Sequence, residues 1–384
     1  MNGSNDVLKE RLQLRADLLS GKKPKRVFVY PRFMLESACG LAGISLIEAH
    51  YSPDLMAQAF DKVCATFYAD ANPLTNTRYP AVYQILGSKS WILGSNGAMQ
   101  HPEIETMMPE DYDDFIAAPY ETILERFLPR ACAAMDADPM SQSLTLAKAV
   151  LAHKKITGQI KASVAGLLQK YSLAPGIANH QMIEAPFDFL SDLLRGFRGV
   201  TMDARRIPDK VEAAVEAILP LMLKLATPAT PRPGLCCFVP LHLAPFIGMK
   251  QFERLYWPTL EKMVAELDKQ GIACALFAEQ DWTRYADYLA SLPASTALYF
   301  EGGDPELLLK TVGAKHPVGG FFDPTVTLTR SKEDCIDEAK RLVEIGMKND
   351  HFYFTFDRQV MDANSLDIPK LQAVLEWVRE NAVY

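Results

Sequence analysis

The sequence lacks the features that mark membrane, exported and nucleic-acid-binding proteins. No stretch approaches the roughly 18 consecutive apolar residues that a membrane-spanning helix needs, and the amino terminus has no apolar core of the signal-peptide kind. The formal net charge of −7 argues against nucleic-acid binding, because such proteins carry dense Lys and Arg patches. The sequence therefore predicts a cytoplasmic protein that binds neither membranes nor nucleic acid.

Paired cysteines and phosphate-binding glycine motifs are also missing. The seven cysteines form no CxxC pair, and an odd, scattered set predicts reduced, buried thiols in place of a disulfide framework. Neither GxGxxG nor GxxxxGK[ST] occurs, which argues against the common nucleotide-binding folds that have an open parallel sheet.

What the chain does have is a regular alternation of short apolar runs and amphipathic segments over its last third. Apolar residues make up 49% and charged residues 23%, the balance of a globular protein. Strands separated by helices predict a parallel sheet. At this length, an α/β fold of the (β/α)8 TIM-barrel type is favoured over an open doubly wound sheet. The strands predicted in this part are 236–241, 272–279, 296–300, 317–322 and 352–356.

The first half of the chain mixes both kinds of element. Residues 1–26 are predicted to form a helical extension before the first strand, and residues 27–384 to form the barrel. Short strands are predicted at 81–86 and 91–93. Residues 120–171 show a helical pattern, with an apolar residue every three to four positions in 141–171.

Ionisable residues follow the predicted strands one after another. In a (β/α)8 barrel the functional groups lie at the carboxyl ends of the strands. A set rich in carboxylate oxygens with one imidazole suits Zn²⁺ or another divalent cation. The residues at these ends are His242, Glu279, Asp281, Glu301, Asp323, Asp357 and Arg358.

Each of these residues also has a structural interpretation. His242 is equally consistent with a core histidine bonded to the backbone. Asp323 precedes a proline and is better explained as a turn cap. Asp357 and Arg358 are adjacent and suit an internal ion pair, while Trp282 is explained either by packing or as the wall of an apolar pocket.

Several runs resemble one protein superfamily. Gly319-Gly-Phe-Phe-Asp-Pro324 resembles the Gly-Asn-Leu-Asp-Pro segment of uroporphyrinogen decarboxylases, with Phe in place of Asn. Other runs are similar to the corrinoid-dependent methyltransferase branch of that superfamily, in particular to the first methyltransferases of phenyl methyl ether O-demethylase systems. They are His242–Pro258, Glu279–Leu289 and Met108–Asp113.

This resemblance implies a TIM barrel that passes a methyl group between an O-methyl donor, such as a methoxylated aromatic, and a separate corrinoid protein. Thiol-directed members carry His-x-Cys where this chain has Phe277-Ala-Glu279, so a thiol substrate is a poor fit. The decarboxylases carry an Arg-rich substrate motif where this chain has only Arg32, so a tetracarboxylate porphyrinogen is a poor fit as well.

On this hypothesis a metal or a general acid activates the leaving oxygen. Three residues are predicted to bind zinc, two acidic residues to take part in catalysis, and three further side chains to bind the substrate. The ligands are His242, Glu279 and Glu301, the acids are Asp281 and Asp357, and the substrate-binding residues are Trp282, Phe322 and Arg358.

Two alternatives remain open. The first is a decarboxylase or lyase of the same fold without metal, which would turn over without a corrinoid partner. The second is a barrel without catalytic activity that binds a corrinoid protein or a small ligand. The sequence leaves open the methyl donor, the direction of transfer and whether the protein forms a homodimer.

Overall fold

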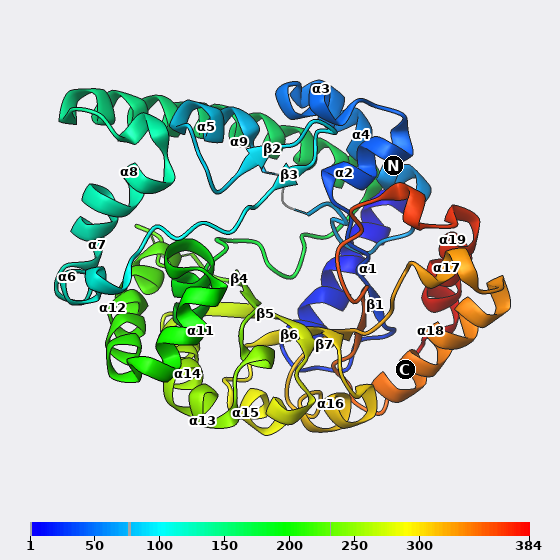
Figure 1. Cartoon of the computed structure of the whole chain (residues 1–384). Coiled ribbons are helices and arrows are strands. Elements are labelled where there is room, and N and C mark those ends of the chain that lie inside the picture. Colours follow the sequence, from blue (N-terminus) through cyan, green and yellow to red (C-terminus); the bar gives the residue numbers. More distant parts are fainter. Residues whose placement is uncertain (1, 76–77, 231) are drawn as a thin grey trace. The chain divides into compact units, whose positions relative to one another are not determined.

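The computed structural model describes residues 2–75, 78–230 and 232–384 (Figure 1). These residues form two compact units, which are described separately below. The first unit comprises residues up to 77, 159–179 and 273–384, and the second comprises 78–158 and 180–272.

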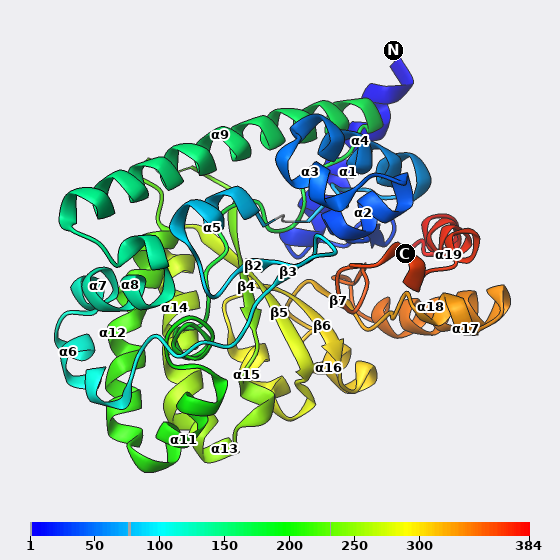
Figure 2. The same ribbon diagram turned by 45° about the horizontal axis from the view of Figure 1, so that its top comes forward.

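The first unit is built on parallel strands. β5, β6 and β7 are hydrogen-bonded neighbours and lie side by side (Figures 1 and 2). β1 pairs with β8. A parallel bridge from Val318 to Phe352 connects β7 to the β8 segment. The strands are β1 (Phe28–Val29), β5 (Ile272–Asp281), β6 (Ala297–Gly302), β7 (Val318–Gly320) and β8 (Tyr353–Phe354).

Two further extended segments continue this series beyond β1. Phe33 forms a parallel bridge with Leu74, and Ala71 forms one with Ala174. The series therefore runs from β5 through β6, β7, β8 and β1 to residues 71–74 and then to residue 174. All of these pairings are parallel, which requires crossover connections between the strands.

Helices supply the crossovers in the first unit. Ser331 caps α18 in a reciprocal capping box with Asp334, and Asp304 and Asp367 cap α16 and α19. These local signals explain why the predicted alternation is confirmed in this part of the chain. The helices are α1 (Asn2–Leu19), α2 (Leu35–Ala42), α3 (Leu46–Tyr51), α4 (Pro53–Thr66), α15 (Ala286–Ser291), α16 (Pro305–Thr311), α17 (Val326–Thr329), α18 (Lys332–Gly346) and α19 (Ile368–Asn381).

The second unit contains β4 (Leu235–Leu241), to which Met182 adds a parallel bridge at Phe238. It also contains an antiparallel hairpin of β2 (Ile92–Leu93) and β3 (Met99–Gln100). The long helix α9 (Pro139–Tyr171) has residues of both units. The other helices are α5 (Pro80–Leu86), α6 (Tyr112–Ala117), α7 (Pro119–Thr122), α8 (Leu128–Ala131), α10 (Pro186–Phe189), α11 (Phe197–Arg206), α12 (Pro208–Ala226), α13 (Met249–Gln251) and α14 (Trp257–Lys269).

One predicted strand is wrong. Residues 81–86 form helix α5, because Pro80 occupies its first turn and Gly87 ends it in a left-handed conformation with φ 62°. The apolar run was too short for its periodicity to separate a strand from a buried helix.

Two other sequence-based expectations can be compared with the structure. All seven cysteines are free, as the sequence predicted, and six of them are buried, whereas Cys64 is half-buried. Among the described residues, no helix combines the length and the apolar character needed to cross a bilayer.

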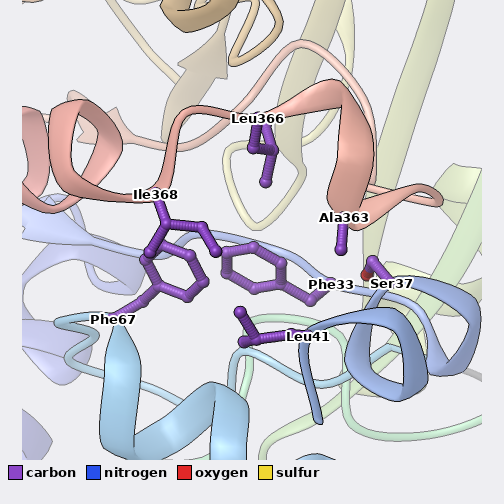
Figure 3. A pocket seen from close by; sticks show the side chains of 7 residues that line it. All are labelled: Phe33, Ser37, Leu41, Phe67, Ala363, Leu366 and Ile368. Atoms are coloured by element: carbon purple, nitrogen blue, oxygen red, sulfur yellow. The ribbon is translucent and has the colours of Figure 1, made fainter. Parts of the chain in front are cut away.

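An apolar pocket of the first unit is shown in Figure 3. Its one polar side chain is Ser37, whose hydroxyl lies 2.9 Å from the Met34 carbonyl and 2.7 Å from the Val360 carbonyl. The pocket therefore offers no group for acid–base or metal chemistry. Its lining residues are Phe33, Ser37, Leu41, Phe67, Ala363, Leu366 and Ile368.

Candidate active-site residues in two units

In the first unit, the end of β5 presents Glu279. Residue Phe277 is in register with Tyr299 of β6, and their rings stack with centroids 4.3 Å apart. Since side chains alternate along a strand, Glu279 follows Phe277 on the same face. The strand ends irregularly at this point, because Gln280 has a φ of 64° and the indole N–H of Trp282 donates to the Glu279 carbonyl at 2.9 Å.

Glu301, at the end of β6, contacts residues near the ends of two other strands, β5 and β8. Its Oε2 accepts the backbone N–H of Gln280 at 2.7 Å, and its Oε1 lies 3.5 Å from Nη1 of Arg358. Asp281 is exposed and its Oδ1 accepts the backbone N–H of Thr283 at 2.8 Å, so it caps a turn. Both carboxylates, of Glu301 and Asp281, therefore already bind groups of the protein itself.

Asp357 is the buried acid of this group, with 4% of its surface exposed. Its Oδ1 accepts the backbone N–H of Arg358 at 2.6 Å, and its Oδ2 lies 3.3 Å from the Arg358 guanidinium. Burial raises the pKa of Asp357 to about 6, against the opposing effect of Arg358. A carboxyl group that titrates near neutral pH suits proton transfer.

The predicted aromatic substrate contacts lie in packed interior. Trp282 and Phe322 are both 0% exposed. The Trp282 ring meets Tyr285 edge-on at 5.2 Å, and Phe322 packs on Phe354 at 5.2 Å. The structure thus places both rings where they support the strand ends. Asp323 caps its own turn, accepting the Thr325 backbone N–H at 2.8 Å, as the sequence favoured.

The sequence analysis named Arg32 as the one arginine at the place of the decarboxylases' substrate motif, but gave it no role in the site. It follows β1 and is 4% exposed. Its Nη1 donates a hydrogen bond to the Tyr299 hydroxyl, and its guanidinium carbon lies 3.8 Å from the centre of the Tyr299 ring. Its Nε and Nη2 have no hydrogen-bond partner within the part of the chain that the structure describes. The signal in the sequence was a lone arginine directly after a strand.

In the second unit, His242 follows β4 and is held by two carboxylates. Its Nδ1 is hydrogen-bonded to Oδ2 of Asp192. Asp188 accepts the backbone N–H groups of His242 at 3.1 Å and Leu243 at 2.9 Å, and the Tyr256 hydroxyl donates to it at 2.5 Å. A carboxylate on one imidazole nitrogen fixes the ring orientation, an arrangement common to catalytic and metal-binding histidines.

Glu184 belongs to the same group of acids. Its Oε2 is buried and has no hydrogen-bond partner among the described residues. Burial, with Asp192 as the next contributor, raises the pKa of Glu184 to about 8, and burial raises that of Asp188 to about 6. Sequence reasoning missed all three acids because they precede or lie within helix α10 and the π-helical turn Leu190–Arg195, away from the strand ends it inspected.

The raised pKa of Glu184 predicts a pH-dependent stability. A carboxyl whose folded-state pKa of about 8 exceeds its ordinary 4.5 binds its proton more tightly in the folded state, so the free energy of unfolding falls as pH rises between these values. Above about pH 7, where Asp188 and Asp357 have largely titrated, Glu184 dominates the fall. We expect Glu184→Gln to flatten the dependence between pH 6 and pH 8 in urea unfolding. An unchanged slope in Glu184→Gln, alongside an unchanged slope in the exposed control Glu216→Gln, would contradict this prediction.

The predicted site residues are divided between the two units. Glu279, Glu301, Asp357 and Arg358 belong to the first unit, whereas His242 belongs to the second. Within residues 2–75, 78–230 and 232–384, no three His, Cys, Asp or Glu residues form a group that could hold a metal. Glu301 is engaged by a backbone N–H and by an arginine, and zinc binding by the predicted ligands stays a prediction.

Comparison with known proteins identifies the family. The family described as Uroporphyrinogen decarboxylase (URO-D) matches residues 156–356, just over half of the chain. The chain belongs to the uroporphyrinogen decarboxylase family. The matched region includes Glu184, Asp192, His242 and Glu279, whereas Arg32 and Asp357 lie outside it.

A solved structure extends the comparison to the whole chain. A methyltransferase from Methanosarcina mazei has a TM-score of 0.62 and 14% sequence identity, covering 97% of this chain and 98% of that one. At this identity the likeness concerns the fold, and with the URO-D match it confirms the predicted (β/α)8 barrel class. No curated protein matches the sequence.

Proposed function

We propose that this URO-D family member is a methyltransferase that moves a methyl group from an O-methyl donor to the Co(I) of a corrinoid protein. The methyltransferase-like runs around His242, Glu279 and Met108 and the fold shared with a methyltransferase support this assignment. The donor class that fits best is a methoxylated aromatic. The observation that carries the proposal is the buried carboxyl of Asp357 at a strand end, whose pKa is raised to about 6.

Methyl transfer from an aromatic ether needs an acid near the ether oxygen. When Co(I) attacks the methyl carbon, its electron pair forms the Co–C bond and the C–O pair stays on the oxygen, where negative charge develops. Co(I) is a strong nucleophile, so the barrier lies in the leaving group. A proton delivered by Asp357 lowers that barrier, and Arg358, 3.3 Å from its carboxylate, holds the acid in place.

The experiment that tests this function is an anaerobic assay of the purified protein with reduced cobalamin and a panel of methoxylated aromatics. We expect release of the corresponding phenol only when Co(I) is present. The metal-free decarboxylase alternative gives the opposite pattern, in which an aromatic or porphyrinic acid is consumed without any corrinoid. A protein that binds donors but never converts them would support a role in binding alone.

Zinc binding stays a prediction, and elemental analysis tests it. If Glu279 is a ligand, purified wild-type protein contains a stoichiometric amount of zinc and Glu279→Gln loses it. Asp281→Asn is a suitable control, because Asp281 is exposed and caps a turn. Equal zinc in wild type and Glu279→Gln would contradict the ligand assignment, and so would wild-type protein that stays metal-free after reconstitution with Zn²⁺.

A further inference from the structure

Two acids of the second unit differ in how their carboxyl groups are satisfied. Asp188 accepts three hydrogen bonds, from the backbone N–H groups of His242 and Leu243 and from the Tyr256 hydroxyl. Glu184 lies four residues earlier, and its buried Oε2 has no hydrogen-bond partner within the part of the chain that the structure describes. Asp188 is thus a satisfied structural residue, whereas the Glu184 carboxyl has lost water at Oε2 without gaining a partner.

A polar group that is buried without a partner destabilises a fold, because it has given up its hydrogen bonds to water. Burial keeps Glu184 protonated at neutral pH, since it raises the pKa of this carboxyl to about 8. A protonated carboxyl donates a hydrogen bond. The side chain as a whole is half-buried, so part of it reaches the surface. The missing partner of Glu184 is therefore a hydrogen-bond acceptor supplied by a ligand.

The charges around Glu184 favour a neutral acceptor. Glu184 interacts electrostatically with Asp192, Asp188 and His242. An anionic ligand would be brought next to two further acids, which costs free energy. A cationic ligand would require Glu184 to give up the proton that burial holds on it. A neutral ligand oxygen meets neither cost.

An aromatic stack lies beside the same pair of His242 and Asp192. Trp91 and His101 flank the β2–β3 hairpin, and their rings stack with centroids 4.0 Å apart and planes at 17°. The guanidinium carbon of Arg78 lies 4.1 Å from the Trp91 ring centre, and two groups this close must cover opposite faces of the ring. His101 is therefore the outer layer of the stack. It is exposed and interacts electrostatically with Asp192 and His242, so it offers a flat stacking surface next to this pair.

We propose that the second unit binds a neutral, flat aromatic ligand whose ring stacks on His101 and whose oxygen accepts a hydrogen bond from Glu184. The stacking surface fixes the plane of the ring, and the single hydrogen bond fixes its orientation within that plane. Aryl ketones, aldehydes and ethers belong to this class of ligand, and a methoxylated aromatic is one of them. The site is inferred from the second unit alone and does not depend on methyl transfer.

Binding of four small probes, followed by NMR titration at pH 7, tests this site without any corrinoid. Acetophenone is neutral and flat and has one acceptor oxygen, benzoate and benzamidine are its anionic and cationic analogues, and cyclohexyl methyl ketone lacks the flat ring. We expect wild type to bind acetophenone most tightly. Glu184→Met should weaken acetophenone binding by about 10-fold, whereas Glu184→Gln keeps a hydrogen-bond donor and should bind it like wild type. His101→Ala should weaken acetophenone binding by about 2- to 10-fold and leave cyclohexyl methyl ketone binding unchanged.

Two control variants belong to the same unit. His153→Ala removes another exposed imidazole that contacts an aromatic ring, Tyr79 at 5.6 Å, and Glu216→Met replaces an exposed glutamate. We expect both to bind all four probes like wild type.

Three results would overturn the proposal. The first is a preference for benzamidine that Glu184→Gln abolishes, since Glu184 would then be a carboxylate that holds a cation. The second is a preference for benzoate, and the third is the absence of saturable acetophenone binding to wild type. Because no turnover is measured, these results are independent of whether the protein transfers methyl groups.

Thermal unfolding at pH 7 gives a second readout that does not depend on the probes. Glu184→Met removes a carboxyl that has no partner at Oε2, so we expect an unchanged or raised midpoint, by up to about 2 °C. Asp188→Leu leaves two backbone N–H groups and the Tyr256 hydroxyl without their acceptor, so we expect a clearly lowered midpoint. An equally large drop in both variants would show that Glu184 is a structural residue and would overturn the proposal.

Discussion

Replacing Asp357 with asparagine is expected to slow methyl transfer by about 100- to 10,000-fold, the usual contribution of a positioned general acid. The side chain keeps its size and its hydrogen-bond acceptor for the Arg358 backbone N–H, which is 2.6 Å away in the wild type. What disappears is the proton held by a carboxyl whose pKa burial raises to about 6. The rate of phenol formation measures the effect, with the donor at saturation.

The pH profile separates a proton donor from a merely structural residue. In wild type the rate should fall as pH rises through about 6, because Asp357 loses its proton there, and Asp357→Asn should lose this dependence. Asp304→Asn is the control, since Asp304 is exposed and caps α16 through backbone N–H groups that asparagine also binds. A wild-type rate that is flat across this range, or a small effect of Asp357→Asn, would contradict the role.

The largest loss of stability is expected for Asp70→Asn, about 3–5 kcal/mol of unfolding free energy, because this change removes the only buried carboxylate that pairs with Arg26 among the described residues and leaves it the partly exposed Glu10. Asp70 is 0% exposed and holds Arg26 through both oxygens. It also accepts the backbone N–H of Val29 at 2.8 Å and the hydroxyl of Tyr68 at 2.5 Å. The carboxylate therefore fixes β1 to the neighbouring extended segment.

Urea unfolding measures this change, with Asp61→Asn as the control. Asp61 also pairs with a cation, Lys170 at 2.6 Å, but both side chains are partly exposed, so a loss of at most about 1 kcal/mol is expected. A similar loss of unfolding free energy in the two variants would show that burial does not determine how much the Arg26–Asp70 pair contributes to stability.

The carboxyl-terminal third of the fold could be predicted because its local signals agree. Strand runs end in polar residues, helices begin at capping residues such as Ser331 and Asp367, and the strands pair in sequence order. The helix at 80–86 was predicted as a strand because a six-residue apolar run has no readable period. Pro80 before the run and Gly87 after it are start and stop signals of a helix, and the prediction did not use them.

Only part of the candidate site could be predicted from the sequence. A sequence shows which residues follow strands, and this rule found His242, Glu279, Glu301 and Asp357. It does not show which acids lose their water, so the protonated carboxyl of Glu184 was missed. The sequence also does not show which side chains form hydrogen bonds with one another. Asp192 is 50 residues from His242, and only the fold brings their side chains into contact.

The central claim of this account is that the methyl group of an aromatic ether ends on cobalt. The most direct test supplies a donor labelled with carbon-13 in its methoxy group, together with the protein and a Co(I) corrinoid, and follows the label by NMR. The account predicts that the label appears as a cobalt-bound methyl group while an equal amount of phenol forms. Phenol formation with the label in methanol, or label retained on the aromatic while carbon dioxide is released, would contradict methyl transfer.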